Sequence, residues 1–157
     1  MLGAFAVGKT SLVQRFVNSI FSDKYLTTIG VKIDQKLVSI DDNQVNLLLW
    51  DIHGEDDFQK VKSSYIMGAS GYFIVMDGTR GETFQVGMQL LDLAKSAAPN
   101  AKCIILINKS DLKSNWEISE DQRNELVSKG YLVFETSAKD NIDVENAFVE
   151  LSKLMIK

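Results

Sequence analysis

The chain of 157 residues is long enough for one domain with one sizeable core, and its length gives no reason to expect two. Hydrophobic residues make up 45% and charged residues 24%, which is ordinary for a globular protein. The net charge is −4 and no basic run is long enough to follow a nucleic-acid backbone, which disfavours nucleic acid as the main partner.

The sequence also lacks the segments that attach a protein to a membrane. No apolar stretch reaches the roughly 18 residues of a membrane span, and no secretory signal is present. The final "SKLMIK" has no cysteine, so we expect no prenyl anchor on this chain. The single Cys103 cannot form an intrachain disulfide, which favours a reducing, cytoplasmic location.

Helix-like and strand-like patterns alternate along the chain. Strands are recognised as short apolar runs and helices by apolar residues at helical spacing. Ser119 is a candidate N-cap and Gly130 a candidate C-cap of one helix. Such alternation predicts one α/β domain over 1–157, with a mainly parallel sheet covered by helices on both faces. In chain order we predict a helix over 8–20, strands over 31–40, 45–52 and 71–77, a helix over 83–97, a strand over 102–108, a helix over 119–130, a strand over 131–137 and a helix over 143–157.

Residues 3–10, "GAFAVGKT", fit the phosphate-loop pattern G-x-x-x-x-G-K-[ST]. In such a loop the backbone N–H groups point at phosphate, Lys9 supplies a positive charge, and the Thr10 hydroxyl can ligate Mg²⁺. A phosphate loop follows a strand, yet only two residues precede Gly3. We therefore expect the first strand to be truncated at the N-terminus, exposing apolar surface and leaving its neighbours unpaired.

A second motif, "WDIHG", ends the strand predicted over 45–52. Asp51 can hold Mg²⁺ through water, and Gly54 can bring its backbone N–H against a γ-phosphate. The spacing D-x-x-G is common by chance, so this motif gains its meaning from the phosphate loop before it.

The motif "NKSD" follows the strand predicted over 102–108. Asp111 can accept hydrogen bonds from N1–H and the exocyclic amine of guanine, a donor pair that adenine lacks. Asn108 can tie this loop to the phosphate loop, and the Lys109 stem can cover the face of the base. A carboxylate placed to pair with guanine rejects adenine, because it would otherwise be left unpaired.

The fourth motif, "ETSAK", ends the strand predicted over 131–137. The backbone of Ser137 and Ala138 can meet the guanine carbonyl oxygen, with Lys139 beside it. Each motif is weak alone, but four in this order, each following a predicted strand, indicate a guanine-nucleotide site at the carboxyl ends of the strands.

These motifs give the chain an end-to-end resemblance to the Ras-superfamily small GTPases, and most to the Rab branch. The resemblance implies a six-stranded, largely parallel sheet with one antiparallel strand, five helices, and binding of GTP/GDP with Mg²⁺. The segments that carry it are "GAFAVGKTSLVQRF", "FSDKYLTTIGV", "LLLWDIHGE", "SSYIMGASG", "INKSDL" and "ETSAK". The nucleotide contacts it implies are Phe5, Ala6, Val7, Gly8, Lys9, Thr10, Ser11, Phe21, Tyr25, Thr28, Gly54, Asn108, Lys109, Asp111, Leu112, Ser137, Ala138 and Lys139.

The resemblance also assigns roles around the γ-phosphate. Thr28 would be the switch I threonine that joins Thr10 and Asp51 around Mg²⁺ and senses the γ-phosphate. Phe21 would pack edgewise on guanine, and Tyr25 would close over the phosphates.

Switch II and a partner surface follow from the same resemblance. Residues 53–65 correspond to switch II. Ile33, Trp50 and Tyr65 stand where Rab proteins carry a hydrophobic triad read by effectors, although Trp50 can also be explained as core packing.

Three positions depart from the family. Glu55 replaces a glutamine that orients the attacking water; a carboxylate keeps an acceptor, loses the N–H donor and adds negative charge, unless the side chain turns into solvent. Phe5 and Ala6 replace small loop residues, so a phenyl ring is expected where an activating arginine would enter, unless the ring packs under switch II. His53 replaces a small residue, and we favour a surface or packing role over a general base.

The sequence therefore predicts a GTP/GDP switch with slow Mg²⁺-dependent hydrolysis, in which Lys9, Thr28 and Glu55 take part in the reaction. The alternative is a GTP-bound scaffold that scarcely hydrolyses, which Phe5 and Glu55 favour. An ATP-using P-loop kinase is disfavoured by "NKSD" and "ETSAK".

Overall fold

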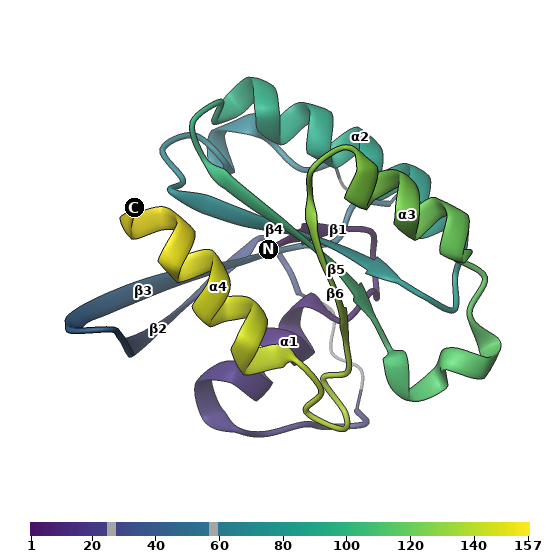
Figure 1. The fold of residues 1–157 in the computed structure, drawn as a ribbon, viewed down its shortest axis with the longest axis horizontal. Helices are drawn as coiled ribbons and strands as arrows, with labels where there is room; N and C mark the ends of the chain where they lie inside the picture. The colour runs from purple at the N-terminus through teal and green to yellow at the C-terminus, as the bar shows by residue number, and fades with distance from the viewer. Residues whose placement is uncertain (25–27, 57–59) are drawn as a thin grey trace.

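The computed structural model describes residues 1–24, 28–56 and 60–157. Strands and helices alternate along most of the chain, and the helices lie on both faces of a central parallel sheet (Figure 1). Helices α2 and α3 cover one face, and α1 and α4 cover the other. The α/β class predicted from the alternating patterns is confirmed.

The observed strands follow the predicted runs closely. The strands are β1 (Leu2–Gly3), β2 (Val31–Ile40), β3 (Asn43–Ile52), β4 (Gly71–Asp77), β5 (Lys102–Asn108) and β6 (Leu132–Thr136). The helices are α1 (Lys9–Asn18), α2 (Glu82–Ala97), α3 (Glu120–Ser128) and α4 (Val144–Ile156), with 3₁₀ helices η1 (Ser63–Tyr65) and η2 (Ser110–Asn115). The resemblance implied five helices; in the described part of the chain four are α-helical and two are 3₁₀.

The parallel sheet has the order β1-β4-β5-β6. Its two central strands are continuous apolar runs because both of their faces are covered by helices. The register pairs Asp77 at the end of β4 with Asn108 at the end of β5, and Asn108 with Thr136 at the end of β6. Polar side chains from three strands are therefore brought to one edge, the carboxyl end of the sheet.

The antiparallel strands β2 and β3 form a separate hairpin, whereas the resemblance implied one continuous six-stranded sheet. All ten residues of each strand pair with the other, and the hairpin projects from the body of the molecule (Figure 1). The terminal amine of Met1 donates a hydrogen bond of 2.9 Å to the Trp50 carbonyl oxygen, which links β1 to β3. With two residues, β1 offers too few backbone groups to join the hairpin to the parallel sheet.

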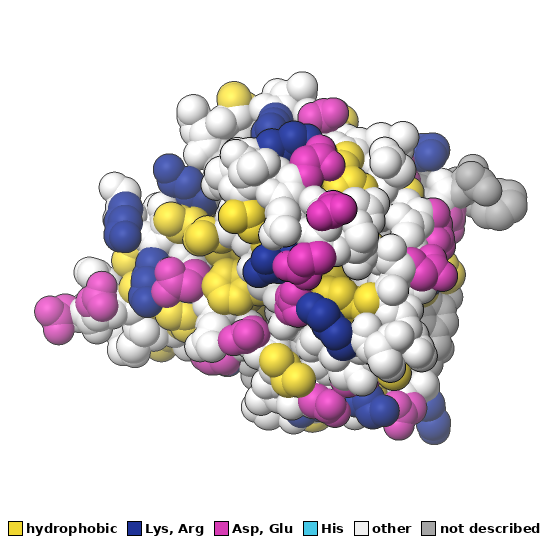
Figure 2. Space-filling model, turned by 45° about the vertical axis from the view of Figure 1, so that its right-hand side comes forward, with side chains coloured by type: hydrophobic (Ala, Val, Ile, Leu, Met, Phe, Trp, Pro, Cys, Tyr) yellow, Lys and Arg dark blue, Asp and Glu magenta, His cyan; other side chains and the backbone are white. Residues whose placement is uncertain are grey.

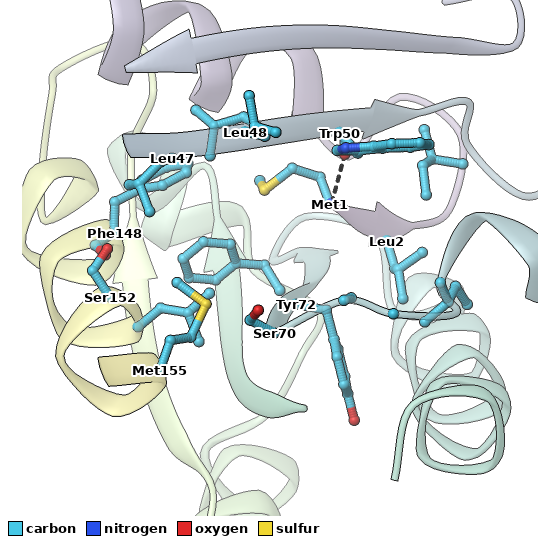
Figure 3. Close-up of a pocket in the computed structure, with 18 of the residues that line it drawn as sticks. Met1, Leu2, Leu47, Leu48, Trp50, Ser70, Tyr72, Phe148, Ser152 and Met155 are labelled. Carbon is cyan, nitrogen blue, oxygen red and sulfur yellow. Dashed lines mark hydrogen bonds between the residues drawn. The ribbon is translucent and has the colours of Figure 1, made fainter. Parts of the chain in front are cut away.

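A groove of about 490 Å³ lies between β3, the start of β4 and α4. Leu47 and Trp50 lie on one side of it, and Phe148 and Met155 of α4 lie on another (Figure 3). The parallel register of β1 reaches Ile74 and Val75, so Gly71–Phe73 of β4 extend beyond it. The truncated first strand stays a prediction.

The core consists of two apolar clusters, one on each face of the parallel sheet. Phe16 of α1 stacks on Phe148 of α4 with ring centroids 4.0 Å apart, and Phe73 of β4 meets Phe148 edge-on at 4.8 Å. Burial of each large side chain contributes about 2–3 kcal/mol. This aromatic contact fixes α1, and with it the phosphate loop, against the sheet.

Within the described residues no helix is both long and apolar enough to cross a membrane.

The predicted N-cap of α3 is confirmed and gives a test of the local fold. The Ser119 hydroxyl accepts the Gln122 N–H at 3.2 Å, and the Gln122 side chain accepts the Ser119 N–H at 2.9 Å. The C-cap is Lys129 and not the predicted Gly130, which follows it with φ 87°. We expect Ser119→Ala to lower the free energy of unfolding by about 1 kcal/mol in urea denaturation. Ser128→Ala, at the exposed end of the same helix, should change it by less than about 0.5 kcal/mol.

Candidate functional site

The phosphate loop lies between β1 and α1 in a conformation that leaves backbone N–H groups open. Ala6 and Gly8 have φ of 62° and 99°, and no side chain caps the N-terminus of α1. The first N–H groups of a helix have no partner within the helix, and they attract anions. At Gly8 an added Cβ would lie 2.3 Å from Asn108 Nδ2, so glycine is required there. This cradle fits a phosphate group.

Lys9 is folded back inside the loop. Its ammonium donates hydrogen bonds to the carbonyl oxygens of Gly3 at 3.1 Å and Ala4 at 2.9 Å, and the residue is 5% exposed. Burial lowers the pKa of Lys9 to about 8, and the nearby Asp51 opposes that shift. A bound phosphate would favour the charged form of this lysine. The structure therefore holds a cation in the centre of the cradle.

Three oxygen ligands predicted for Mg²⁺ are brought together. The Thr10 hydroxyl donates to Asp51 Oδ2 at 2.6 Å and lies 2.8 Å from the Thr28 hydroxyl. Asp51 Oδ1 is buried and has no hydrogen-bond partner in the described part of the chain, and burial raises the pKa of this carboxyl. Among the described residues, no group of three or more His, Cys, Asp or Glu side chains is placed so that it could hold a metal ion. One carboxylate with two hydroxyls suits Mg²⁺, which completes its shell with phosphate and water.

Asn108 at the end of β5 joins the base-recognition loop to the phosphate loop. Its Nδ2 donates to the Val7 carbonyl oxygen at 3.0 Å, and its Oδ1 accepts the Thr136 hydroxyl at 3.2 Å. Asn108 is 2% exposed and Thr136 is fully buried. The structure contains the link between the two loops that was predicted for Asn108. Thr136 also takes part in this hydrogen-bond network, and the sequence did not indicate it.

The residues predicted to read guanine meet at the same edge. Asp111 Oδ1 accepts the Ser137 hydroxyl at 2.7 Å, which joins "NKSD" to "ETSAK". The Lys109 ammonium lies 2.6 Å from the fully buried carboxylate of Asp77. Asp77 had no role in the sequence analysis, and only its place at the end of β4 could have indicated one. Of the remaining predicted contacts in these two loops, Ala138 is buried, and Leu112 and Lys139 are exposed.

Arg15 of α1 is a residue of this edge that sequence reasoning missed. Its Nε donates to the Ala138 carbonyl oxygen at 2.7 Å and its Nη2 to that of Lys139 at 2.8 Å. The guanidinium also lies over the ring of Phe21, 5.9 Å from the centroid. Arg15 thus holds the "ETSAK" loop and Phe21 beside one another, as the predicted base-stacking role of Phe21 requires.

The start of the predicted switch II packs directly on the phosphate loop. The Phe5 N–H donates to the Glu55 carbonyl oxygen at 3.0 Å, and the Glu55 N–H donates to Gly3 at 3.1 Å. An added Cβ at Gly54 would lie 2.4 Å from Phe5 Cα, so this approach requires glycine. Arg80, which the sequence analysis also missed, donates from Nη1 to the Phe5 carbonyl oxygen at 2.8 Å. Both backbone polar groups of Phe5 are therefore engaged within the protein.

Glu55 and His53, the two residues of the predicted switch II that depart from the family, have partners within the protein. Glu55 is 13% exposed; its Oε2 accepts the Val61 N–H at 3.3 Å and its Oε1 lies 3.5 Å from the Lys60 ammonium. His53 is 8% exposed, with ring nitrogens 3.2 Å from the Gly30 carbonyl oxygen and 3.3 Å from that of Lys60. These contacts agree with a packing role rather than a surface role for His53, and they differ from a Glu55 side chain turned into solvent.

The predicted partner surface is partly exposed. Ile33 and Trp50 are direct cross-strand partners, 53% and 42% exposed, and Trp50 and Tyr65 both line the groove described above. Figure 2 shows hydrophobic side chains on one face of the molecule interspersed with charged groups of both signs.

Of the remaining predicted nucleotide contacts, Ser11 is half-buried at the start of α1. Tyr25 lies outside the described residues.

The site combines three features: a phosphate cradle at the N-terminus of α1, the Thr10 hydroxyl beside the Asp51 carboxylate, and the Asp111 carboxylate at the same edge of the sheet. Together they define a P-loop nucleotide-binding protein. The chain belongs to the Ras family, whose profile matches residues 1–157. It is 33% identical to the Ras-related protein Rab-2B of Dictyostelium discoideum, over all of this chain and 79% of that protein.

Two further relatives are similar to this chain over almost its whole length. The GTP-binding protein yptV2 of Volvox carteri is 33% identical over 98% of this chain and 72% of its own length. The Ras-related protein RABA6a of Arabidopsis thaliana is 36% identical over 95% of this chain and 65% of its own length. The chain is thus a small GTPase close to the Rab branch, and its membership implies GTP binding and a switch function.

The Asn108 hydrogen bonds give a direct test of the link between the two loops. Asn108→Ala leaves the Val7 carbonyl oxygen and the Thr136 hydroxyl without this partner, and each buried unpaired group costs about 1–3 kcal/mol. We expect the free energy of unfolding in urea to fall by at least about 2 kcal/mol. Asn100→Ala, at an exposed turn, is the control. Equal effects of the two substitutions would contradict a structural role for the Asn108 bonds.

Proposed function

We propose that this protein is a GTP/GDP switch with slow, Mg²⁺-dependent GTP hydrolysis, acting on partners through its switches and the Ile33, Trp50 and Tyr65 surface. The observation that carries the proposal is the gathering of the Thr10, Thr28 and Asp51 oxygens beside the phosphate cradle. In a cytoplasmic Rab-like protein this set would link γ-phosphate to switch I.

The chain's own residues supply binding and positioning. Lys9 neutralises phosphate charge from inside the loop, and the open N–H groups at the start of α1 orient the phosphates. Thr10, Thr28 and Asp51 would hold Mg²⁺, which neutralises the charge that develops on the phosphates. Asp111, supported by Ser137, accepts from guanine. Loss of the γ-phosphate removes the contact that holds Thr28 and releases the switches.

The slow rate follows from Glu55. Its carboxylate is held by Lys60 and the Val61 N–H, so it must leave those contacts before it can accept a hydrogen bond from attacking water. It also lacks the N–H donor of a glutamine. Phe5 adds a second constraint, because its ring lies on the loop that an arginine from an activating protein would approach. The second candidate, a GTP-bound scaffold that scarcely hydrolyses, is favoured by the same two residues.

Single-turnover hydrolysis of preloaded GTP tests the role of Glu55. We expect slow hydrolysis by the wild-type protein and an increase of about tenfold or more in Glu55→Gln, because removal of one transition-state donor costs about 10²–10³ in rate. Phe5→Gly should leave GDP affinity within about threefold, since phosphate binding uses backbone N–H groups. Glu150→Gln, in the middle of α4, is the control. Brisk wild-type turnover would contradict slow hydrolysis, and no turnover in any variant would favour the scaffold.

The nucleotide that co-purifies with the protein tests specificity. We expect GDP or GTP in the supernatant after denaturation, identified by ion-exchange chromatography, because Asp111 pairs with donors that adenine lacks. Added Mg²⁺ chelator should speed nucleotide release, since the ligand oxygens then lack their cation. Recovery of ADP or ATP in comparable amount would contradict the proposed guanine recognition.

A further inference from the structure

Trp116 follows η2 directly and contacts the loop after β5 that carries Lys109 and Asp111. Its indole Nε1 donates to the Lys109 carbonyl oxygen at 3.0 Å. The ring lies so close to Gly78 that an added Cβ there would be 2.1 Å from Trp116 Cε2. The Lys113 ammonium lies over the ring, 4.2 Å from its centroid. The indole is therefore fixed from three sides.

The Lys109 carbonyl oxygen that receives this bond closes the turn carrying Asp111. It also accepts the Leu112 N–H at 2.9 Å, so the turn spans residues 109–112. Lys109 itself has φ of 69°, a left-handed conformation that is unfavourable for a non-glycine residue. Such a conformation persists where surrounding contacts enforce it. The indole N–H and the Lys109–Asp77 ion pair are two contacts that do so.

The residues after Trp116 extend the same attachment to the loop between β4 and α2. The N–H groups of Glu117 and Ile118 donate to the Gly78 carbonyl oxygen at 2.7 and 3.1 Å, and the Gly78 N–H donates to Asn108 at 3.0 Å. The Glu117 carboxylate accepts the Gly81 N–H at 2.8 Å. The segment Trp116–Ile118 thus joins the loop that carries Asp111 to the loop that carries Arg80.

We infer that Trp116 is a positioning residue for guanine recognition. Its indole N–H holds the 109–112 turn from one side while the Ser137 hydroxyl holds the Asp111 carboxylate from the other. Trp116 acts through Lys109 and Asp111, and its role is to keep the carboxylate where N1–H and the exocyclic amine of guanine arrive together. The inference rests on the proposed function, in which Asp111 reads guanine.

A packing role and a positioning role predict different selectivity. If Trp116 only fills space against Gly78, its loss weakens all nucleotides alike. If it positions Asp111, its loss weakens guanine nucleotides more than inosine nucleotides, because inosine lacks the exocyclic amine and uses one contact fewer to the carboxylate. The ratio of GDP to IDP affinity therefore separates the two roles.

The test is Trp116→Phe, which keeps an aromatic ring beside Gly78 and removes the N–H donor. We expect GDP affinity, measured by calorimetry on nucleotide-free protein, to fall about tenfold, and the GDP:IDP preference to fall at least about threefold. The control is Tyr131→Phe, which removes one polar group from a half-buried aromatic outside the site and packed in the same apolar cluster. Its preference should equal that of the wild type.

A double substitution tests whether the effect passes through the carboxylate. In an Asp111→Asn background, Trp116→Phe should produce no further change in the GDP:IDP preference, because effects along one path do not add. Additive changes in that preference, or an unchanged preference in Trp116→Phe alone, would overturn the inference. Wild-type protein that binds no guanine nucleotide would instead contradict the proposed function.

If Trp116→Phe does not fold, the indole N–H of the wild-type protein decides. Its NMR signal, assigned by its persistence in Trp50→Phe, should exchange slowly with solvent and shift when GDP replaces IDP. An indole N–H that exchanges like that of a free peptide, or that is unchanged between the two nucleotides, would overturn the inference.

Discussion

The hydrogen bond from Asn108 to the Val7 carbonyl oxygen is the interaction on which the rest of the site depends. It joins a loop at the end of β5 to the loop before α1, across 101 residues of sequence. Asn108 also pairs with Asp77 and Thr136 in the strand register. A single buried amide therefore sets the distance between the phosphate cradle and the carboxylate of Asp111, and a nucleotide spans that distance.

The register of the parallel strands explains why these groups meet. Parallel strands present their carboxyl ends at one edge, where the helices that cover the sheet begin with open N–H groups. Here that edge gathers Asp77, Asn108 and Thr136, and α1 begins at the same edge with its phosphate loop. Arg15 and Arg80 then hold backbone carbonyl oxygens of two different loops toward this edge. The base and phosphate ends of the site thus form one connected set of hydrogen bonds.

Much of this arrangement could be predicted from the sequence, because the motifs lie directly after apolar runs whose type is clear. Strands over 71–77 and 102–108 match β4 and β5 at both ends, and the Ser119 cap begins α3. The supporting residues could not be predicted in the same way. Arg15 and Arg80 bond to carbonyl oxygens far away in sequence, and Trp116 bonds to one seven residues back, across η2, so no regular local pattern indicates these three residues. The separation of the β2–β3 hairpin from the parallel sheet likewise depends on tertiary pairing, which the apolar pattern of β3 does not record.

The position of Phe5 shows how binding and hydrolysis can be separated within one loop. Its N–H is taken by Glu55 and its carbonyl oxygen by Arg80, so phosphate contacts fall to the residues that follow it. A side chain at this position therefore has little reason to change ground-state binding. The approach of Gly54 is more demanding, since a Cβ there would collide with the backbone of Phe5. In the proposed mechanism this close approach of Gly54 to Phe5 holds the next residue, Glu55, against the phosphate loop. In that mechanism a change in the side chains at 5 and 55 would alter the rate of hydrolysis, whereas a side chain at 54 would remove the contact on which the proposed switch depends.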